Sequence, residues 1–369
     1  MSRMIDRVLA YGIANPHPKV QGVFGDAVPI GIQNVADYFY MDLEREWDIT
    51  DFPNVAPPFR KYWLEYVVSP RHIPGSDIPA FSVGVLAFGA DLTDLAATFG
   101  VDDGYRNLLL SAYSRLINGE RIPLKINGRA ALSPPPAHDE ESRRVQMWAL
   151  LTGMDWQGSD QEYFPGQDKP PDEYVMMLMR AVCLLPVAPV RWMTAMRVYV
   201  EAPERHIRGP QLYATIPVRH DGGVYGGIHI YHPEAQTVGL DTVRDEAYYL
   251  MNPALLALSF LHCKNVTLET TDPPARLSKA FQRRNGRPLL SYHTLNIEPM
   301  RRVLKHEGQS ETTGLKKAMH ICRGHFKDYS KHGLFGKYKG MYWWESHVRG
   351  SADEGAVLKD YNVTTPRRA

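Results

Sequence analysis

The chain has few cysteines and no long uninterrupted apolar run. Its three cysteines, Cys183, Cys263 and Cys322, lie far apart and form no CxxC pair. This pattern excludes a disulfide framework and a four-cysteine zinc site, and it indicates a reducing compartment. The most apolar stretches, residues 174–190 and 248–263, are interrupted by Arg, Asn or Pro, so neither reaches the ~20 apolar residues that cross a bilayer. We therefore expect no association with a membrane.

Common enzyme signatures are missing as well. The motifs GxSxG, HExxH and GxxxxGK[ST] do not occur, and they carry the chemistry of many hydrolases, zinc proteases and phosphate-binding loops. The glycine-rich run 222–227 lies in a predicted hairpin, where it is not expected to bind a nucleotide. His320, Cys322 and His325 would need a distant fourth ligand to hold zinc. We expect no cofactor and no metal ion.

The first 16 residues carry Arg3, Asp6 and Arg7 and have no apolar core, so we expect no secretory signal in this segment. The spacing of their apolar residues instead predicts a short amphipathic helix.

The net charge of +1 conceals two oppositely charged parts. From Pro273 to Ala369 there are 19 Lys and Arg against 8 Asp and Glu, which is a net charge of +11. Residues 1–272 contain the remaining 23 Lys and Arg against 33 Asp and Glu, which is a net charge of −10. A short and strongly basic segment is a candidate surface for phosphate-rich partners. Alternatively, the basic segment packs on the acidic part of its own chain, and the two interpretations are compatible.

The composition, 44% hydrophobic and 22% charged over 369 residues, is typical of a globular protein with two or three domains. Apolar patterns predict strands over residues 62–68, 78–88, 196–200, 212–218, 224–231 and 289–297. They predict helices over residues 105–118, 145–152, 173–185 and 245–262. The predicted fold class is α+β, with an acidic mixed α/β body over residues 1–272 and a basic, mainly β module over residues 273–369. A Pro-rich stretch marks a further internal boundary near residues 133–144.

The basic module carries most of the chemically distinctive patterns. They are Asn285-Gly286-Arg287-Pro288-Leu289, Arg323-Gly324-His325, Trp343-Trp344, and the segment from Gly355 to Val363. With these residues the module resembles an uncharacterised family of tailed-phage and prophage proteins, from which it departs at Leu289, where the family has a second proline. The resemblance covers about a quarter of the chain and implies no established activity. It implies a phage or prophage origin, and hence a location in the cytoplasm of a bacterial host, with association with the virion left open.

Histidines and arginines in the module could support nuclease chemistry. Metal-independent ribonucleases use a general acid, a general base and a cation that stabilises the reacting phosphate. His325 and His347 would be the acid and base, and Arg323 and Arg349 the cations, if residues 319–329, 341–349 and 356–361 form neighbouring strands. Alternatively, His325 is a buried histidine hydrogen-bonded within the sheet.

Three functional classes remain. The first is a phage-encoded nucleic-acid-binding protein that acts through the basic module. Its phosphate contacts would come from Arg276, Lys279, Arg283, Arg284, Arg287, Lys327 and Lys337, and its base-stacking ring from Trp344. The second is a metal-independent nuclease, so whether the protein is an enzyme is left open. The third is a structural or host-interaction protein of a phage, with a host or phage protein as its partner. The choice between RNA and DNA and the oligomeric state are open.

Overall fold

The structure is a computed structural model. It describes residues 3–14, 26–41, 47–72, 79–98, 103–126, 129–152, 173–202, 211–231, 240–306, 318–349 and 351–356. It combines helices with a large mixed sheet, which confirms the predicted α+β class. None of the described helices is both long enough and apolar enough to span a bilayer.

The chain forms two compact units whose limits differ from the predicted boundary after residue 272. Unit 1 comprises Met1–Ser259 and Glu269–Thr294, and unit 2 comprises Phe260–Leu268 and Leu295–Ala369. The first part of the basic segment therefore belongs with the body. The reason is strand pairing, because β10 pairs in parallel with β1 through Ile30 and His293.

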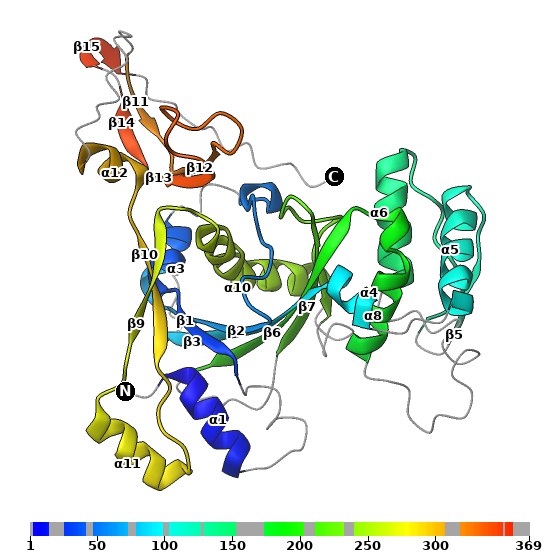
Figure 1. The fold of residues 1–369 in the computed structure, drawn as a ribbon, viewed down its shortest axis with the longest axis horizontal. Coiled ribbons are helices and arrows are strands. Elements are labelled where there is room, and N and C mark those ends of the chain that lie inside the picture. Colours follow the sequence, from blue (N-terminus) through cyan, green and yellow to red (C-terminus); the bar gives the residue numbers. More distant parts are fainter. Residues whose placement is uncertain are drawn as a thin grey trace. The chain divides into compact units, whose positions relative to one another are not determined.

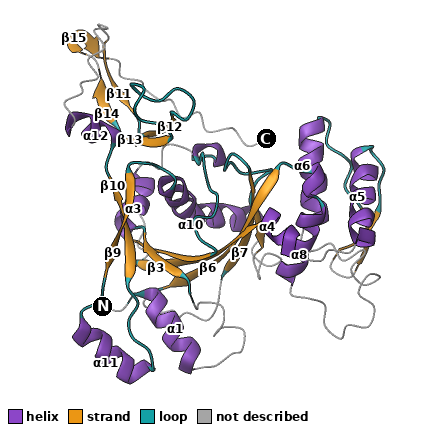
Figure 2. Cartoon of the chain, viewed as in Figure 1, coloured by secondary structure: helices purple, strands orange, loops and turns teal. Residues whose placement is uncertain are grey.

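An eight-stranded sheet forms the centre of unit 1 (Figures 1 and 2). Its order is β8-β7-β6-β3-β2-β1-β10-β9. The strands are β1 (Val28–Gly31), β2 (Lys61–Val68), β3 (Phe81–Asp91), β6 (Val190–Glu201), β7 (Leu212–Arg219), β8 (His229–Tyr231), β9 (Val266–Thr271) and β10 (Tyr292–Ile297). The sheet is mixed because β1 is parallel to both of its neighbours, whereas β2, β3, β6, β7 and β8 pair antiparallel. Strands β9 and β10 each continue into unit 2.

Alternation along β2 directs its side chains to two covered faces. Trp63 packs against apolar residues of α1 (Met4–Ala14), and the N–H of Met4 donates to Glu65 Oε1 at 3.0 Å. On the other face, the hydroxyl of Tyr66 donates to the carbonyl of Leu250 in α10 (Leu240–Leu261). Helices α1 and α10 therefore lie on opposite faces of the sheet (Figure 2).

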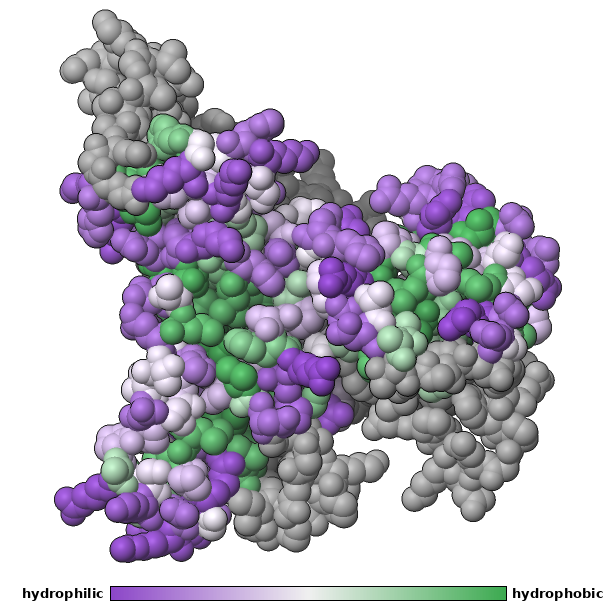
Figure 3. Space-filling view, in the orientation of Figure 1, coloured by the Kyte–Doolittle hydropathy of each residue, from purple (hydrophilic) through white to green (hydrophobic). Residues whose placement is uncertain are grey.

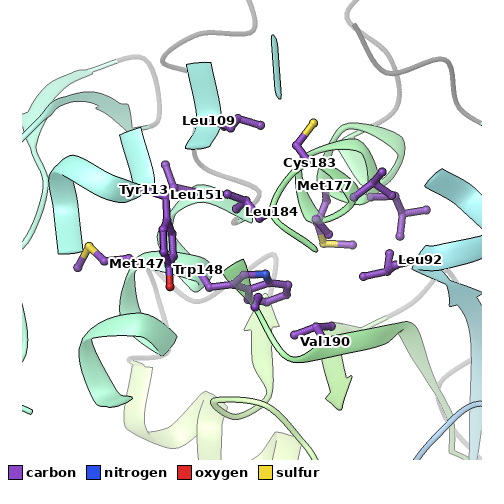
Figure 4. Packing of buried hydrophobic residues seen from close by; sticks show 14 of the residues in the cluster. Leu92, Leu109, Tyr113, Met147, Trp148, Leu151, Met177, Cys183, Leu184 and Val190 are labelled. Atoms are coloured by element: carbon purple, nitrogen blue, oxygen red, sulfur yellow. The ribbon is translucent and has the colours of Figure 1, made fainter. Parts of the chain in front are cut away.

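A helical insertion between β3 and β6 has its own apolar core (Figure 4). Its elements are α4 (Leu92–Thr98), α5 (Asp103–Ile117), β4 (Pro123–Ile126), β5 (Arg129–Leu132), α6 (Glu140–Thr152) and α8 (Glu173–Cys183). Leu109 and Tyr113 of α5 share this core with Trp148 and Leu151 of α6. Residues 133–144 run from the end of β5 into the first turn of α6, within the same helical insertion, so the predicted internal boundary there is not a division between the compact units.

The described part of unit 2 consists mainly of short strands together with the helix α12. Its elements are α12 (Met300–His306), β11 (Ala318–Cys322), β12 (His325–Asp328), β13 (Met341–Trp344), β14 (His347–Arg349) and β15 (Ser351–Ala356). The Asn265 side chain donates to the carbonyls of Glu298 at 2.6 Å and Trp343 at 3.0 Å, and it accepts the N–H of Trp343 at 3.0 Å. These bonds attach residues 260–268 to β13, which explains why that segment belongs to unit 2.

Most predicted elements are present with shifted ends. The strand predicted over residues 224–231 is largely absent, since β8 covers only His229–Tyr231. The predicted turn before it exists, with the N–H of Arg219 bonded to the carbonyl of Gly223 at 2.8 Å and φ of +89° at Gly222. The predicted third strand of the module, residues 356–361, lies beyond the described residues except for Ala356, the last residue of β15.

Candidate nucleic-acid interface

Four of the predicted phosphate-binding residues lie on α11 (Ala275–Asn285) in unit 1. The helix follows Pro274 and ends at Gly286, whose φ of +75° and N–H bond to the carbonyl of Gln282, at 2.8 Å, complete a left-handed C-cap. The residues between Pro274 and Gly286 include good helix formers such as Arg, Leu, Lys, Ala and Gln. The basic run therefore folds as a helix.

One side of α11 attaches it to unit 1. Ser278, Phe281 and Asn285 recur at helical spacing and are partly buried, whereas the other helix residues are exposed. The N–H of Leu289 donates to Ser278 Oγ at 3.2 Å. Helix α11 also lies beside α1 (Figure 1). These contacts fix which side of α11 faces solvent.

The solvent side of α11 carries a basic stripe. Arg276, Lys279 and Arg283 lie three and four positions apart on one side of the helix, and Arg284 flanks them. All four side chains are exposed, the helix contains no Asp or Glu, and within the described residues none of the four forms an ion pair. The surface over α11 is predominantly hydrophilic (Figure 3). Guanidinium and ammonium groups in this arrangement suit contacts with phosphate oxygens.

Arg287 belongs to the predicted set but has a different role. Its guanidinium lies 3.2 Å from Asp6 Oδ1, and the two side chains are only 19% and 3% exposed. The N–H of Leu290 donates to the same carboxylate oxygen at 3.2 Å. Burial lowers the pKa of Arg287, and the charge of Asp6 opposes this shift. Contrary to the predicted phosphate contact, Arg287 anchors the segment after α11 to α1.

The predicted catalytic residues lie on or beside two antiparallel strand pairs of unit 2. Strands β12 and β13 pair antiparallel with His325 opposite Trp344, and β11 and β14 pair antiparallel with Cys322 opposite His347. The β11–β14 pair continues the register of the β12–β13 pair. Two residues separate Cys322 from His325, and two residues likewise separate Trp344 from His347. The two ladders are thus in register with each other across a two-residue interruption, and β15 adds a third strand beside β11.

The predicted catalytic residues lie at different positions along the two strand pairs. His325 is partly buried, and its Nδ1–H donates to the carbonyl of the exposed Arg323 at 2.9 Å. This bond leaves Nε2 as the acceptor of the neutral ring. His347 and Arg349 lie on β14, opposite Cys322 and His320, and their side chains are outside the described part of the structure. The His/Arg/His site therefore stays a prediction.

Neither tryptophan of β13 is available for stacking on a base. Trp343 is 4% exposed and packs against Phe260 and Phe326, with ring centroids 4.8 and 4.7 Å away. Trp344 is 2% exposed in a cluster with Met300 and other residues of unit 2. The Nζ atom of the exposed Lys327 lies 5.3 Å from the centre of the Trp344 ring. The stacking role predicted for Trp344 is therefore wrong, because both faces of the strand are packed.

The loop between β12 and β13 carries an exposed aromatic residue that the sequence patterns did not single out. Phe335 in this loop is 57% exposed and has a φ of +54°. The predicted phosphate ligand Lys337 is exposed in the same loop, with Nζ 5.1 Å from the Tyr338 ring centre. The sequence pattern that could have indicated an exposed aromatic residue in a turn is Leu334-Phe335-Gly336, in which Phe335 precedes a glycine within a lysine-rich run.

No group of His, Cys, Asp and Glu side chains suited to a metal ion occurs within the described residues. The side chains of His320 and Cys322 lie outside that part of the structure. Comparison with protein-family models, with curated proteins and with solved structures finds no match to the chain. The resemblance to a tailed-phage family stays a prediction based on the motifs.

Proposed function

We propose that the protein binds nucleic acid and that the basic stripe of α11 is a main contact with the phosphate backbone. The observation that carries this proposal is an exposed helix with four basic side chains, no acidic one, and a defined attached side. The phage origin implied by the C-terminal motifs, and a role in the cytoplasm of a bacterial host, are part of the same proposal.

The electrostatics of α11 support a polyanionic partner. Arg276 and Lys279, and Lys279 and Arg283, are like-charged pairs at helical spacing, and each such pair destabilises a helix by about 0.2–0.5 kcal/mol. Arg276 also lies in the first turn, where the helix dipole disfavours a cation. Phosphates along the stripe would relieve both effects. The arrangement is thus more stable with a bound polyanion than without one.

Unit 2 carries a basic surface of its own. Its described side chains include nine Lys and Arg against three Asp and Glu. Arg301, Arg302 and Lys305 are all exposed on helix α12. A sequence-independent electrostatic attraction to nucleic acid follows from such an excess.

The test compares two triple variants of the full chain by salt titration against labelled single-stranded and duplex oligonucleotides. The first replaces Arg276, Lys279 and Arg283 with Gln. Since each phosphate contact contributes about 0.7–0.9 to the slope of log affinity against log salt, the slope should fall by about 2 to 3. The strands are then run on a denaturing gel, where cleavage would favour the nuclease class.

The matched control replaces Arg106, Arg115 and Arg144 with Gln. These are also basic residues of unit 1, Arg115 and Arg144 exposed and Arg106 partly exposed, and each pairs with a nearby carboxylate on the helical insertion. The control has the same change in net charge and should bind almost as the natural chain does. Equal slopes for the two triple variants would contradict a specific role of α11, and no binding at low salt would contradict the proposal as a whole.

A further inference from the structure

The loop between β12 and β13 ends in a tight turn around Phe335. Leu334 and Tyr338 exchange backbone hydrogen bonds of 2.8 and 3.1 Å, and the N–H of Lys337 also donates to the carbonyl of Leu334 at 3.1 Å. Phe335 and Gly336 therefore occupy the two central positions of the turn. Both have positive φ, +54° and +68°, the pattern of a type I′ turn, which normally uses Asn, Asp or Gly at these positions.

Phe335 is an unusual residue for this position. A bulky side chain with positive φ is strained, and such residues persist only where the surrounding structure enforces them. The Phe335 ring is also the most exposed aromatic side chain in the described part of unit 2. The turn thus combines a strained backbone with an apolar ring in water, and neither contributes to the stability of the free protein.

A rigid scaffold holds the ring outward. Tyr338 is buried in the apolar cluster of unit 2, and Leu334 packs against the same cluster. At the base of the loop, the N–H of Tyr329 donates to the carbonyl of Gly340 at 2.8 Å, and the N–H of Ser330 donates to Asp328 Oδ1 at 2.8 Å. The residues on both sides of Phe335 are therefore fixed, and the ring projects from a well-defined position.

The surroundings of Phe335 are cationic. Lys331, Lys337 and Lys339 are exposed in the same loop, with His332 beside the first of them. Residues 329–344 contain no Asp or Glu. Lysines next to a projecting aromatic ring are suited to bind a nucleotide, because the lysines can contact its anionic phosphate and the ring can stack on its flat base.

We propose that the Phe335 ring stacks on an unpaired base of a nucleic-acid strand while the loop lysines contact its phosphates. This inference rests on the proposed function and specifies its ligand as single-stranded nucleic acid. In a duplex, both faces of each base are already stacked on neighbouring base pairs, so the ring would find no free face. A lipid surface is less suitable because the loop offers one exposed apolar side chain, and Leu334 points into the cluster instead.

The test measures the binding of the full chain to single-stranded DNA, single-stranded RNA and duplex DNA of equal length at one salt concentration. Phe335→Trp should keep the affinity for single strands, whereas Phe335→Leu and Phe335→Gly should lose about 5- to 150-fold, the range measured when a stacking ring is removed. Duplex binding should be nearly the same in all variants. Comparing DNA with RNA identifies the natural strand.

Phe335→Gly also controls for folding. Glycine adopts positive φ without strain, so this variant should keep or raise the melting temperature while its affinity for single strands falls. Single-strand binding of Phe335→Leu and Phe335→Gly equal to that of the natural chain, together with weakened binding of the α11 triple variant, would overturn the stacking inference and leave the proposed function intact. No binding of any oligonucleotide would overturn both. Binding to phosphatidylserine vesicles that is lost in Phe335→Gly and kept in Phe335→Leu would overturn the inference in favour of a lipid surface.

Discussion

The hydroxyl of Tyr40 donates a hydrogen bond to the backbone carbonyl of Tyr249, 3.2 Å away. Tyr249 lies four residues before Pro253, in the interior of α10. Proline has no N–H, so it cannot donate to the carbonyl of Tyr249 as a normal helix residue would. Tyr40, on α3 (Gln33–Met41), supplies the missing donor from a separate helix. The proline and the tyrosine therefore compensate each other across 213 residues of sequence.

This relationship predicts that Tyr40 and Pro253 are energetically coupled. Tyr40→Phe leaves a partly buried carbonyl without a donor and should lower the free energy of unfolding by about 1–2 kcal/mol. In a Pro253→Ala background the loss should be smaller, because alanine at this position brings a backbone N–H of its own. Urea unfolding of the four proteins measures the coupling.

Tyr249→Phe is the matched control for this experiment. The Tyr249 hydroxyl is buried and has no hydrogen-bond partner within the described residues. Removing it should leave stability unchanged or slightly raised. An equal loss for Tyr40→Phe with and without Pro253 would show that the Tyr40 hydroxyl does not compensate for the proline.

Removal of Arg287 should destabilise unit 1, whereas removal of the exposed Arg284 of α11 should not. Arg287→Ala leaves the buried Asp6 carboxylate without its charge partner, and a broken buried pair loses about 3–5 kcal/mol. Arg284→Ala, three residues earlier and exposed, should change the free energy of unfolding by less than about 0.5 kcal/mol. Thermal unfolding of both variants decides the matter, and equal stability of the two would contradict a structural role of the Asp6–Arg287 pair.

The two cysteines with described side chains should be unreactive in the folded protein. Cys183 and Cys263 are buried, and burial raises the pKa of these thiols to about 11 and about 12. In a Cys322→Ser variant, Ellman's reagent at pH 8 should label neither thiol quickly, and it should label both after unfolding in guanidinium. Fast labelling of the native variant would contradict the burial of the two side chains.

The same pKa shifts predict a loss of stability in alkali. The folded state favours the neutral thiols, whereas the unfolded chain ionises them near the ordinary value of 9.0. The contribution of the thiols to stability is therefore complete below pH ~9 and decreases as the pH rises toward 11 to 12. Replacing both cysteines with Ala should reduce this part of the pH dependence, which unfolding experiments between pH 8 and pH 11 would measure.

Local patterns in the sequence determined much of the secondary structure and the distribution of charge. The aromatic and β-branched run of residues 62–68 predicted β2, and the leucine spacing of residues 105–118 predicted α5, because both patterns depend on neighbouring residues only. The basic run after residue 275 likewise identified the residues of the α11 stripe. Such inferences succeed where a segment's structure follows from its own side chains.

Tertiary structure decided which of these residues are available. Arg283 and Arg287 are equivalent in the sequence, but Asp6 pairs with only one of them after the chain returns to α1. The sequence predicted that Trp344 stacks on a base, yet Trp343 and Trp344 are both buried because unit 2 packs on both faces of β13. The boundary between the units depends on strand pairing between residues more than 260 positions apart, Ile30 and His293. Burial and pairing arise from contacts distant in sequence, so only the folded chain reveals that α11 and Phe335, rather than Trp344, face the solvent.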